Sequence, residues 1–371
     1  MNITTIVGAR PQFIKAAAVS RAMSAADRDI VEHILHTGQH YDENMAKVFF
    51  TQLGIPQPKW NLEIHGGNHG AMTGKMLEQI EKVLIGDRPD LVLIYGDTNS
   101  TLAGALAAAK LQIPAAHVEA GMRSFRPDMP EEINRIAADR VSRILLCSSP
   151  TAVKNLKNEG MPASDSNGNA LQEVHLVGDV MYDVLLHVQQ SIMPSADVLR
   201  LRDEIGSVFS LATCHRAENT DSKDNLVQIF SALDEISRSE KVVLPLHPRT
   251  KQAMEKFGIR SNFIKFVDPL NYRDLLYLAG ESRCVLTDSG GLQKEAWWLG
   301  KPCITMRDET EWCELVQYGC NILTGASREK ITLAYTDSAQ LPMNAPTDIF
   351  GSGDSAEKIV GILTSFAVKR P

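Results

Sequence analysis

The chain has 371 residues, 44% hydrophobic and 22% charged, with a formal net charge of −7 at pH 7. That length exceeds what a single hydrophobic core usually supports, so we expect two domains of an ordinary globular protein. The negative charge and the lack of a long basic run exclude a non-specific nucleic-acid binder. The N-terminus does not resemble a signal peptide, and no stretch is long enough to span a bilayer, so we expect a cytoplasmic protein with no membrane partner.

Cysteine and histidine usage argues against a metal centre. The six cysteines contain no C-x-x-C pair, and several lie in apolar, strand-like runs, where a free thiol behaves as a small hydrophobic side chain. The ten histidines are too scattered for a zinc signature. We therefore expect reduced thiols and no bound metal.

Apolar segments typical of strands alternate with amphipathic helical segments along almost the whole chain. The expected strands include residues 3–7, 91–95, 115–118, 174–177, 209–213, 242–246 and 285–287, and the expected helices include residues 12–22, 102–111 and 355–366. This alternation predicts βαβ units and parallel sheets, that is, an α/β protein. Residues 162–172, rich in Ser, Asp, Asn and Gly, are predicted to form a loop. We expect an N-terminal domain of residues 1–173 plus 355–371 and a C-terminal domain of residues 174–354.

The turn after the first expected strand is a candidate anion site. It reads Gly-Ala-Arg-Pro and leads into a helix that carries Lys15. A helix N-terminus binds phosphate through its free N–H groups and its dipole, and Arg10 and Lys15 would add full charges. A surface turn with two solvated cations is the alternative interpretation.

Three carboxylates lie just outside buried runs between residues 97 and 131. Asp97 and Glu119 follow two expected strands, and Glu131 opens the next helix. Because ligands of open α/β sheets bind outside the carboxyl ends of the strands, these acids together predict an acidic catalytic cleft. Asp97 could instead cap a helix, and Glu131 with Glu132 could interact with a helix dipole. A structural ion-pair network is a further alternative, and its possible cations are Arg123, Arg126 and Arg135.

A histidine follows the expected strand at residues 209–213. His215 could donate a proton to a leaving phosphate, with Arg216 or Glu218 orienting it, or it could be purely structural. Cys214 lies beside it, but adjacent residues of an extended chain point to opposite sides. We therefore do not expect a thiol nucleophile.

A second candidate phosphate site spans residues 287–296, Thr-Asp-Ser-Gly-Gly-Leu-Gln-Lys-Glu-Ala. Ser289, Gly290 and Gly291 would let the backbone approach an anion at a helix start. Glu295 lies about a turn and a half into that helix, where a carboxylate can accept hydrogen bonds from ribose hydroxyls. The strand-turn-helix context favours a nucleotide site over an ordinary glycine turn.

Taken together, these stretches resemble the non-hydrolysing UDP-N-acetylglucosamine 2-epimerase family. The motifs are Gly-Ala-Arg-Pro with Lys15, Tyr-Gly-Asp-Thr, His-Val-Glu-Ala-Gly-Met-Arg, Pro-Glu-Glu-Ile-Asn-Arg, His215-Arg216 and Thr-Asp-Ser-Gly-Gly-Leu-Gln-Lys-Glu, in order over essentially the whole chain. The resemblance implies two Rossmann-like domains with parallel sheets (the glycosyltransferase-B-type fold) and a last helix that returns to the N-terminal domain. It also implies a UDP-sugar substrate in the interdomain cleft.

The resemblance further implies roles for single residues. Asp97, Glu119 and Glu131 fall on the acid/base carboxylates, and His215 would serve the departing diphosphate. The residues implied to bind the nucleotide and diphosphate are Arg10, Lys15, His215, Ser289, Gly290, Gly291 and Glu295. Two positions depart from the family pattern: Trp312-Cys313-Glu314 stands where many members have Arg-Pro-Glu, and Leu270 stands where a Gln follows Asp-Pro.

Other stretches resemble one branch of the family, which acts on UDP-2,3-diacetamido-2,3-dideoxyglucuronate. That branch makes the mannuronate epimer for bacterial surface polysaccharide, such as the O-antigen of lipopolysaccharide. The stretches are residues 37–42, 65–74 and 307–312. Binding a carboxylate at C6 of the substrate would require an extra cation or hydrogen-bond donor in the sugar pocket. The candidates are Arg123, Arg126 and His69.

The C2 proton of such a sugar is not next to a carbonyl, so its removal needs a special route. Oxidation by NAD would require a G-x-G-x-x-G fingerprint and a Tyr-x-x-x-Lys pair, and the sequence has neither. We therefore expect no cofactor, and an isomerase that eliminates UDP across C1–C2 and adds it back after a proton reaches the other face. The alternatives are a UDP-N-acetylglucosamine 2-epimerase that makes UDP-N-acetylmannosamine, a hydrolysing 2-epimerase, a UDP-sugar glycosyltransferase and a non-catalytic UDP-sugar sensor. We also expect a homodimer.

Overall fold

The computed structural model describes residues 1–26, 30–39, 55–164, 166–168, 170–191, 193–341, 343, 346 and 348–368. The chain forms two compact units, Met1–Leu186 with Thr347–Pro371, and His187–Pro346. None of the helices in the described ranges combines enough length with enough apolar sequence to traverse a bilayer.

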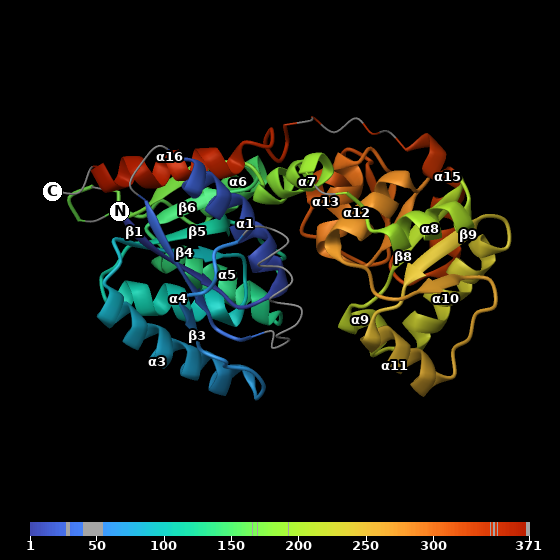
Figure 1. Ribbon diagram of the computed structural model, residues 1–371, viewed down its shortest axis with the longest axis horizontal. Helices are drawn as coiled ribbons and strands as arrows, with labels where there is room; N and C mark the ends of the chain where they lie inside the picture. Colours follow the sequence, from blue (N-terminus) through green and yellow to red (C-terminus); the bar gives the residue numbers. More distant parts are fainter. Residues whose placement is uncertain are drawn as a thin grey trace. The chain divides into compact units, whose positions relative to one another are not determined.

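The first unit is built on a parallel sheet with the strand order β3-β2-β1-β4-β5-β6-β7. Its strands are β1 (Asn2–Val7), β2 (Val31–His36), β3 (Trp60–Asn61), β4 (Leu91–Tyr95), β5 (Ala115–Ala120), β6 (Ile144–Cys147) and β7 (Glu173–Leu176). Its helices are α1 (Arg10–Ala25), α3 (His69–Asp87), α4 (Asn99–Lys110), α5 (Pro130–Val141), α6 (Pro150–Asn158), the first part of α7 (Val180–Ser191) and α16 (Ser355–Val368). In Figure 1, α1 and α16 lie on one side of this sheet and α3 and α4 on the other.

Strand β4 lies in the middle of the first sheet, as its apolar sequence predicts. Every residue from Leu91 to Tyr95 is buried, as expected for a strand covered by helices on both faces. The helix that follows is rich in alanine and packs closely on the sheet, because a Cβ added at Gly104 would lie 2.9 Å from Ile6 Cδ1. Small side chains in α4 therefore bring the start of this helix close to the strand ends.

The second unit holds a second parallel sheet, with the order β10-β9-β8-β11-β12-β13. Its strands are β8 (Phe209–Thr213), β9 (Lys241–Pro245), β10 (Lys265–Val267), β11 (Val285–Thr287), β12 (Cys303–Thr305) and β13 (Asn321–Leu323). Its helices are α8 (Ala196–Ile205), α9 (Ala217–Thr220), α10 (Lys223–Ser237), α11 (Pro248–Phe257), α12 (Tyr272–Glu281), α13 (Gly290–Trp298), α14 (Cys313–Gln317), α15 (Arg328–Asp337) and a 3-10 turn, η1 (Ser338–Gln340).

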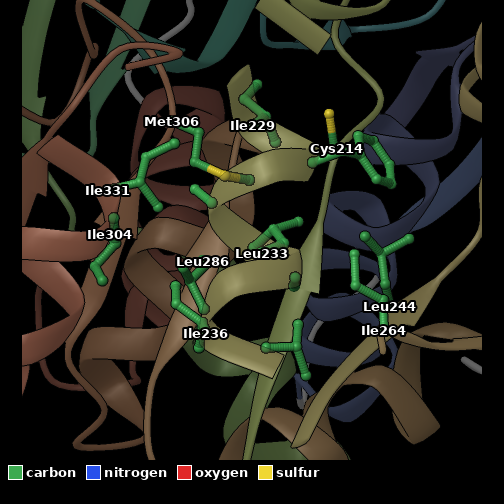
Figure 2. Close-up of a cluster of buried hydrophobic side chains, with 14 of the residues drawn as sticks. Cys214, Ile229, Leu233, Ile236, Leu244, Ile264, Leu286, Ile304, Met306 and Ile331 are labelled. Carbon is green, nitrogen blue, oxygen red and sulfur yellow. The ribbon is translucent and has the colours of Figure 1, made fainter. Parts of the chain in front are cut away.

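One face of the second sheet carries the hydrophobic cluster drawn in Figure 2. Ile229, Leu233 and Ile236 recur at helical spacing on α10 and are buried against the sheet. Leu244 of β9 and Leu286 of β11 meet them from the strands. This packing holds β8 and β11 side by side, which matters because both strands end at the candidate site.

Both sheets have the strand order of a Rossmann-like fold. Counted from their first strands, each runs 3-2-1-4-5-6, and the first sheet adds β7 at its edge. The predicted class, α/β with two Rossmann-like parallel sheets, is confirmed. The order reverses between β1 and β4 and again between β8 and β11, and ligands of such sheets bind at the carboxyl ends of those strands.

The chain leaves the first unit later than the expected boundary at residues 173/174. Strand β7 pairs in parallel with β6, from Ile144 with Glu173 to Cys147 with Leu176, so it is part of the first sheet. The change of unit falls within α7, and the return falls before α16 rather than at residue 355. Helix α16 packs against α1 of the first unit.

Asp183 of α7 forms a hydrogen bond with the start of α16, and its ionisation should affect stability. Its Oδ1 accepts a hydrogen bond from the Ala356 N–H at 2.8 Å, and burial raises the pKa of Asp183 to about 6. The folded protein therefore binds this proton more tightly than the unfolded chain does. It follows that the stability contribution of Asp183 falls as the pH rises from about 4 to about 6.

The variant Asp183→Asn keeps the side-chain shape but cannot ionise. We expect its free energy of unfolding, relative to that of the wild type, to be about 2 kcal/mol higher at pH 7 than at pH 4. Chemical denaturation of both proteins at the two pH values measures the difference. An unchanged difference would contradict a raised pKa at Asp183.

Candidate active site

The structure brings together three of the predicted residues at the carboxyl ends of β1, β4 and β5. Lys15 of α1 forms an ion pair with Glu119 of β5, and both side chains are largely buried. Burial opposes the charged form of Lys15, but Glu119, with smaller contributions from Asp97 and Asp179, raises the pKa of Lys15 above its ordinary value. Lys15 is therefore a buried cation among carboxylates, not a solvated surface charge.

Glu119 has an unusual backbone conformation. Its φ is 71°, in the left-handed region that disfavours side chains other than glycine, and the pairing of β5 with β6 shifts register between Val118 and Ala120. Gly96, which follows β4, also has a positive φ of 62°, and a Cβ there would lie 3.3 Å from Glu119 Oε2. Strained backbone of this kind persists only where surrounding contacts hold it, and it is common at functional sites.

Asp97 is held by Arg135 of α5. Arg135 Nη2 and Nε donate to Asp97 Oδ2 at 2.5 and 3.1 Å, and Arg135 Nη1 donates to Glu132 Oε2 at 2.9 Å. The helix-capping interpretation of Asp97 is wrong, because Thr98 caps α4 by accepting from the Thr101 N–H. The acidic cluster is thus also an ion-pair network, with Arg135 as one of its cations.

The two adjacent glutamates of α5 lie in different environments. Glu132 is 2% exposed and accepts hydrogen bonds from the Ser124 and Phe125 N–H groups, each at 2.9 Å. Although burial opposes the change, these donors and Arg135 lower the pKa of Glu132. Glu131 is exposed and has no hydrogen bond or ion pair within the described part of the chain. The structure therefore does not join Glu131 to the Asp97 and Glu119 cluster.

Gln12, which sequence reasoning missed, occupies the turn after β1. Its Oε1 accepts from the N–H groups of Gly8 and Ala9 at 2.8 and 3.0 Å, and its Nε2 donates to the Tyr95 carbonyl at 2.8 Å. These two N–H groups of the predicted anion site are thus engaged by a side chain. Arg10 begins α1 and is half-buried.

A buried network that sequence reasoning also missed lies beneath the two acid-bearing turns. His117 of β5 and Asp139 of α5 are both 0% exposed, with His117 Nδ1 2.7 Å from Asp139 Oδ1. The Asp139 carboxylate also accepts from the Gly121 N–H at 3.1 Å and from Arg123 Nη1 at 2.8 Å. The available signal was a histidine inside an apolar strand, since a buried polar side chain requires a partner.

The candidate cations for a C6 carboxylate lie in different settings. Arg123 is buried, and its guanidinium binds Glu159 through two hydrogen bonds of 2.7 and 2.8 Å as well as Asp139. Arg126 is exposed and pairs with Asp128 at 2.7 Å, and His69 begins α3. Arg123 is therefore committed to the interior of the unit.

Two of the branch-like stretches lie in the first unit. Of residues 37–42, residues 40–42 lie outside the described residues. Thr37 is buried with its Oγ1 2.8 Å from Ser100 Oγ, and Gln39 Oε1 accepts from Ser100 Oγ at 2.8 Å. In the stretch 65–74, His69 Nδ1 lies 3.3 Å from Asn99 Nδ2. Both stretches thus contact the start of α4, next to Asp97.

In the second unit, Asp288 holds the loop that carries His215. Asp288 is fully buried after β11, and its carboxylate accepts from the His215 N–H at 3.0 and 2.9 Å and from the Arg216 N–H at 2.9 Å. Asn219 Nδ2 donates to the same carboxylate at 3.1 Å. The His215 ring stays half-exposed, 5.4 Å from the ring of His247. His215 is thus positioned through its backbone, and its ring Nδ1 lies 3.6 Å from Asp288 Oδ1.

The glycine-rich start of α13 forms the predicted second turn. Ser289 is its N-cap residue, and Gly290 and Gly291 open the helix. Glu295 is buried, and Tyr272 donates its hydroxyl hydrogen to Glu295 Oε1 at 2.8 Å. Tyr272 lies outside the motif, so sequence reasoning missed it.

The departures from the family pattern have structural explanations. Trp312 Nε1 donates to the Gly290 carbonyl at 2.8 Å, and the Lys294 ammonium lies 3.5 Å from the centroid of the Trp312 ring. Leu270 packs against a second hydrophobic cluster, which includes Phe209 and Leu211 of β8. Nearby, Arg307 is buried and donates to Glu218 at 2.9 Å and to Glu311 at 3.1 Å. Glu218 is therefore the partner of Arg307.

Cysteine chemistry and metal binding find little support in the described residues. Burial raises the pKa of Cys214 well above its ordinary value, so its thiol stays protonated beside His215. Within the described ranges, no group of three or more His, Cys, Asp or Glu side chains could hold a metal ion.

Two Rossmann-like sheets, each with polar residues gathered where its strand order reverses, define an α/β enzyme of the glycosyltransferase-B-type fold. The family model for UDP-N-acetylglucosamine 2-epimerase matches residues 22–364. The chain belongs to the UDP-N-acetylglucosamine 2-epimerase family, and it is an isomerase.

Individual relatives cover almost the whole chain. It is 49% identical to the UDP-2,3-diacetamido-2,3-dideoxy-D-glucuronate 2-epimerase of Pseudomonas aeruginosa, over 98% of this chain and 99% of that protein. It is 42% identical to the UDP-N-acetylglucosamine 2-epimerase of Methanocaldococcus jannaschii, with 98% and 99% covered. The crystal structure of the latter organism's UDP-GlcNAc 2-epimerase in complex with UDP-GlcNAc and UDP matches with a TM-score of 0.88 at 41% identity, covering 98% and 100% of the two chains.

The role of Asp288 can be tested by stability. We expect Asp288→Asn to destabilise the second unit by about 2 to 3 kcal/mol, because an amide has one acceptor oxygen and would turn its own N–H towards buried donors. Three of the four tryptophans lie in this unit, so denaturation followed by tryptophan fluorescence reports on it. The matched control is Asp221→Asn, which removes a surface pair with Arg249 and should cost less than about 1 kcal/mol. Equal losses in the two variants would contradict this role.

Proposed function

We propose that this protein inverts C2 of a UDP-2-acetamido sugar by elimination and re-addition of UDP. The observation that carries the proposal is the pair of carboxylates at neighbouring strand ends, Glu119 beside Lys15 and Asp97 beside Arg135, in a chain of this family. General acid–base catalysis needs such positioned groups, and a departing diphosphate needs cations. The absence of a dinucleotide fingerprint in the sequence favours this path over oxidation at the sugar.

In the proposed step, a base takes the C2 proton, and the electron pair of the C2–H bond becomes the C1=C2 double bond. The bond from C1 to the diphosphate oxygen breaks, and UDP leaves with its electrons. An acid then delivers a proton to the opposite face of C2, and the UDP oxygen bonds C1 again. The overall reaction is an isomerisation, with neither water nor an oxidant consumed.

We assign the proton chemistry to Asp97, Glu119 and Glu131, and the departing diphosphate to His215. Nucleotide and diphosphate binding is assigned to Arg10, Lys15, His215, Ser289, Gly290, Gly291 and Glu295. The ion pair of Lys15 with Glu119 supports a shared role, because a diphosphate would compete with the carboxylate for the same ammonium. The role of the exposed Glu131 is assigned from its position in the motif alone, since its neighbour Glu132 binds Arg135.

The preferred substrate is UDP-2,3-diacetamido-2,3-dideoxyglucuronate, with the mannuronate epimer as product. The 49% identical relative named for this sugar supports the choice, as does the branch-like stretch at residues 307–312. For the C6 carboxylate, Arg126 and His69 are the better candidates, because Arg123 is engaged by Asp139 and Glu159. The second candidate substrate is UDP-N-acetylglucosamine, which the name of the 42% identical relative suggests.

We further propose that the enzyme is a cytoplasmic homodimer whose product enters a bacterial surface polysaccharide such as the O-antigen. Support comes from the branch resemblance. Sedimentation equilibrium tests the oligomer, and a mass of one chain would contradict the dimer.

The elimination route predicts solvent exchange. Turnover of the UDP-sugar in D2O should place deuterium at C2, because the proton removed differs from the proton returned.

Asp97→Asn should lower kcat about 1,000-fold or more while UDP still binds, because most of the assigned nucleotide residues lie in the other unit. Glu78→Gln, at an exposed pair with Lys82 on α3, should turn over normally. Turnover without C2 deuterium would exclude the route, and full activity of the Asp97 variant would remove Asp97 from the chemistry.

The substrate assignment predicts a ratio of specificity constants. Offered side by side, the diacetamido-uronate should give a kcat/KM at least about 100-fold above that of UDP-N-acetylglucosamine, because a site with donors for the C6 carboxylate leaves them unpaired with a C6 hydroxyl. NMR of the two reaction mixtures measures both rates. The reverse ratio would establish the second candidate instead.

A further inference from the structure

His117 is a fully buried histidine that the proposed chemistry does not use. It lies on β5, two residues before Glu119, and its ring reaches from β5 to the turn after β4. Nε2 lies 2.7 Å from the Gly96 carbonyl oxygen, and Nδ1 lies 2.7 Å from Asp139 Oδ1. Both ring nitrogens are therefore at hydrogen-bond distance from an oxygen atom.

These contacts determine what the ring can do. A carbonyl oxygen only accepts, so Nε2 carries a hydrogen and is not free to act as a general base. Asp139 Oδ2 accepts from Arg123 Nη1 at 2.8 Å and from the Gly121 N–H at 3.1 Å, and the ion pair with Arg123 favours the ionised carboxylate, so Oδ1 is also an acceptor. With acceptors at both nitrogens the imidazole donates from both, which is the imidazolium form.

The charges of the surrounding network agree with a cation at this position. Asp139 and Glu159 contribute two negative charges, and Arg123 contributes one positive charge. A protonated His117 brings the sum of these charges to zero, with Glu159 partly exposed at the edge of the network. Cys147 of β6 is also close to Asp139, but burial raises its pKa, so it adds no charge.

The same network reaches both turns that carry the proposed acids. Through Nε2, His117 holds the carbonyl of Gly96, the residue before Asp97. Through Asp139, it is linked to the N–H of Gly121, two residues after Glu119. Gly96, Glu119 and Gly121 all have positive φ, at 62°, 71° and 79°, so these turns need contacts to hold them.

We propose that His117 is a positioning residue that, as a buried imidazolium, links the turn of Asp97 to the turn of Glu119 and so sets the spacing of the two carboxylates. It makes the acids productive without touching substrate. Its effect on turnover rests on the proposed function, whereas its charge and its contacts do not.

Two substitutions separate the contacts of the ring. The amide of His117→Gln reaches the position of Nε2 and keeps a donor for Gly96, while the amide of His117→Asn reaches only the position of Nδ1 and keeps the contact with Asp139. We expect the Asn variant to lose about 100-fold in kcat, because a small misplacement of a catalytic group costs that much, with little change in KM or in UDP affinity. The Gln variant should stay within about 10-fold of the wild type.

The matched control is His33→Gln, which alters another histidine of the same sheet, paired with Asp87 at 3.1 Å. It should leave kcat unchanged. Wild-type kcat in the His117→Asn variant would overturn the proposal, as would equal losses of kcat and UDP affinity in both His117 variants, since a merely structural role acts on folding as a whole.

The charge is measured directly on the intact protein. In 15N-histidine-labelled enzyme, with His117 assigned by comparison with the Gln variant, we expect both ring nitrogens to be protonated. A neutral tautomer would overturn the imidazolium. If the wild type epimerises neither UDP-sugar, the proposed function fails, and the NMR experiment still decides the state of His117.

Discussion

A fully buried aspartate organises loops at the carboxyl ends of the strands in each sheet. In the first unit, Asp139 binds His117, Arg123 and the Gly121 N–H. In the second, Asp288 binds the N–H groups of the His215 loop. A buried carboxylate costs several kcal/mol unless its oxygens are satisfied, so a loop that moved away would leave an unpaired charge. Movement of these loops would leave a buried carboxylate without hydrogen-bond donors. The free-energy cost of that unpaired charge holds the loops in place.

This constraint lets the first unit hold acids close together. Two neighbouring carboxylates repel each other, and here each has its own cation, Lys15 for Glu119 and Arg135 for Asp97. Glu119 has a positive φ in this pairing, and a glycine at residue 96 suits it, because a Cβ there would lie 3.3 Å from Glu119 Oε2. Backbone strain, ion pairing and the buried network thus act on the same two turns, and a change in one reaches the others.

The second unit shows how a departure from the family pattern is accommodated. The family resemblance implies a cation in many members where this chain has Trp312, whose ring receives the ammonium of Lys294 and whose N–H donates to the Gly290 carbonyl. The start of α13 is therefore held by an aromatic side chain. Because the indole contacts the backbone of the glycine turn, the geometry of that turn depends on a residue from a different loop.

Local patterns in the sequence were sufficient for the fold class and for the strand ends at which the candidate site residues lie. The strands at residues 91–95, 209–213 and 285–287 have the predicted bounds, because a continuous apolar run between turn residues is a local property. The edge strand β7 was predicted at residues 174–177 and lies one residue earlier, at Glu173–Leu176, where its residues are only partly buried. The expected domain boundary at residues 173/174 falls within this strand.

Only the tertiary structure decided which side chains meet. Glu131 and Glu132 are adjacent and of one type, yet about 100° of helical rotation turns one to solvent and the other to Arg135. His117 and Asp139 are 22 residues apart and meet because β5 and α5 pack together. The chain by itself therefore determined the elements and the chemical groups at their ends, whereas the pairing of those groups depended on packing between distant segments, which no local pattern records.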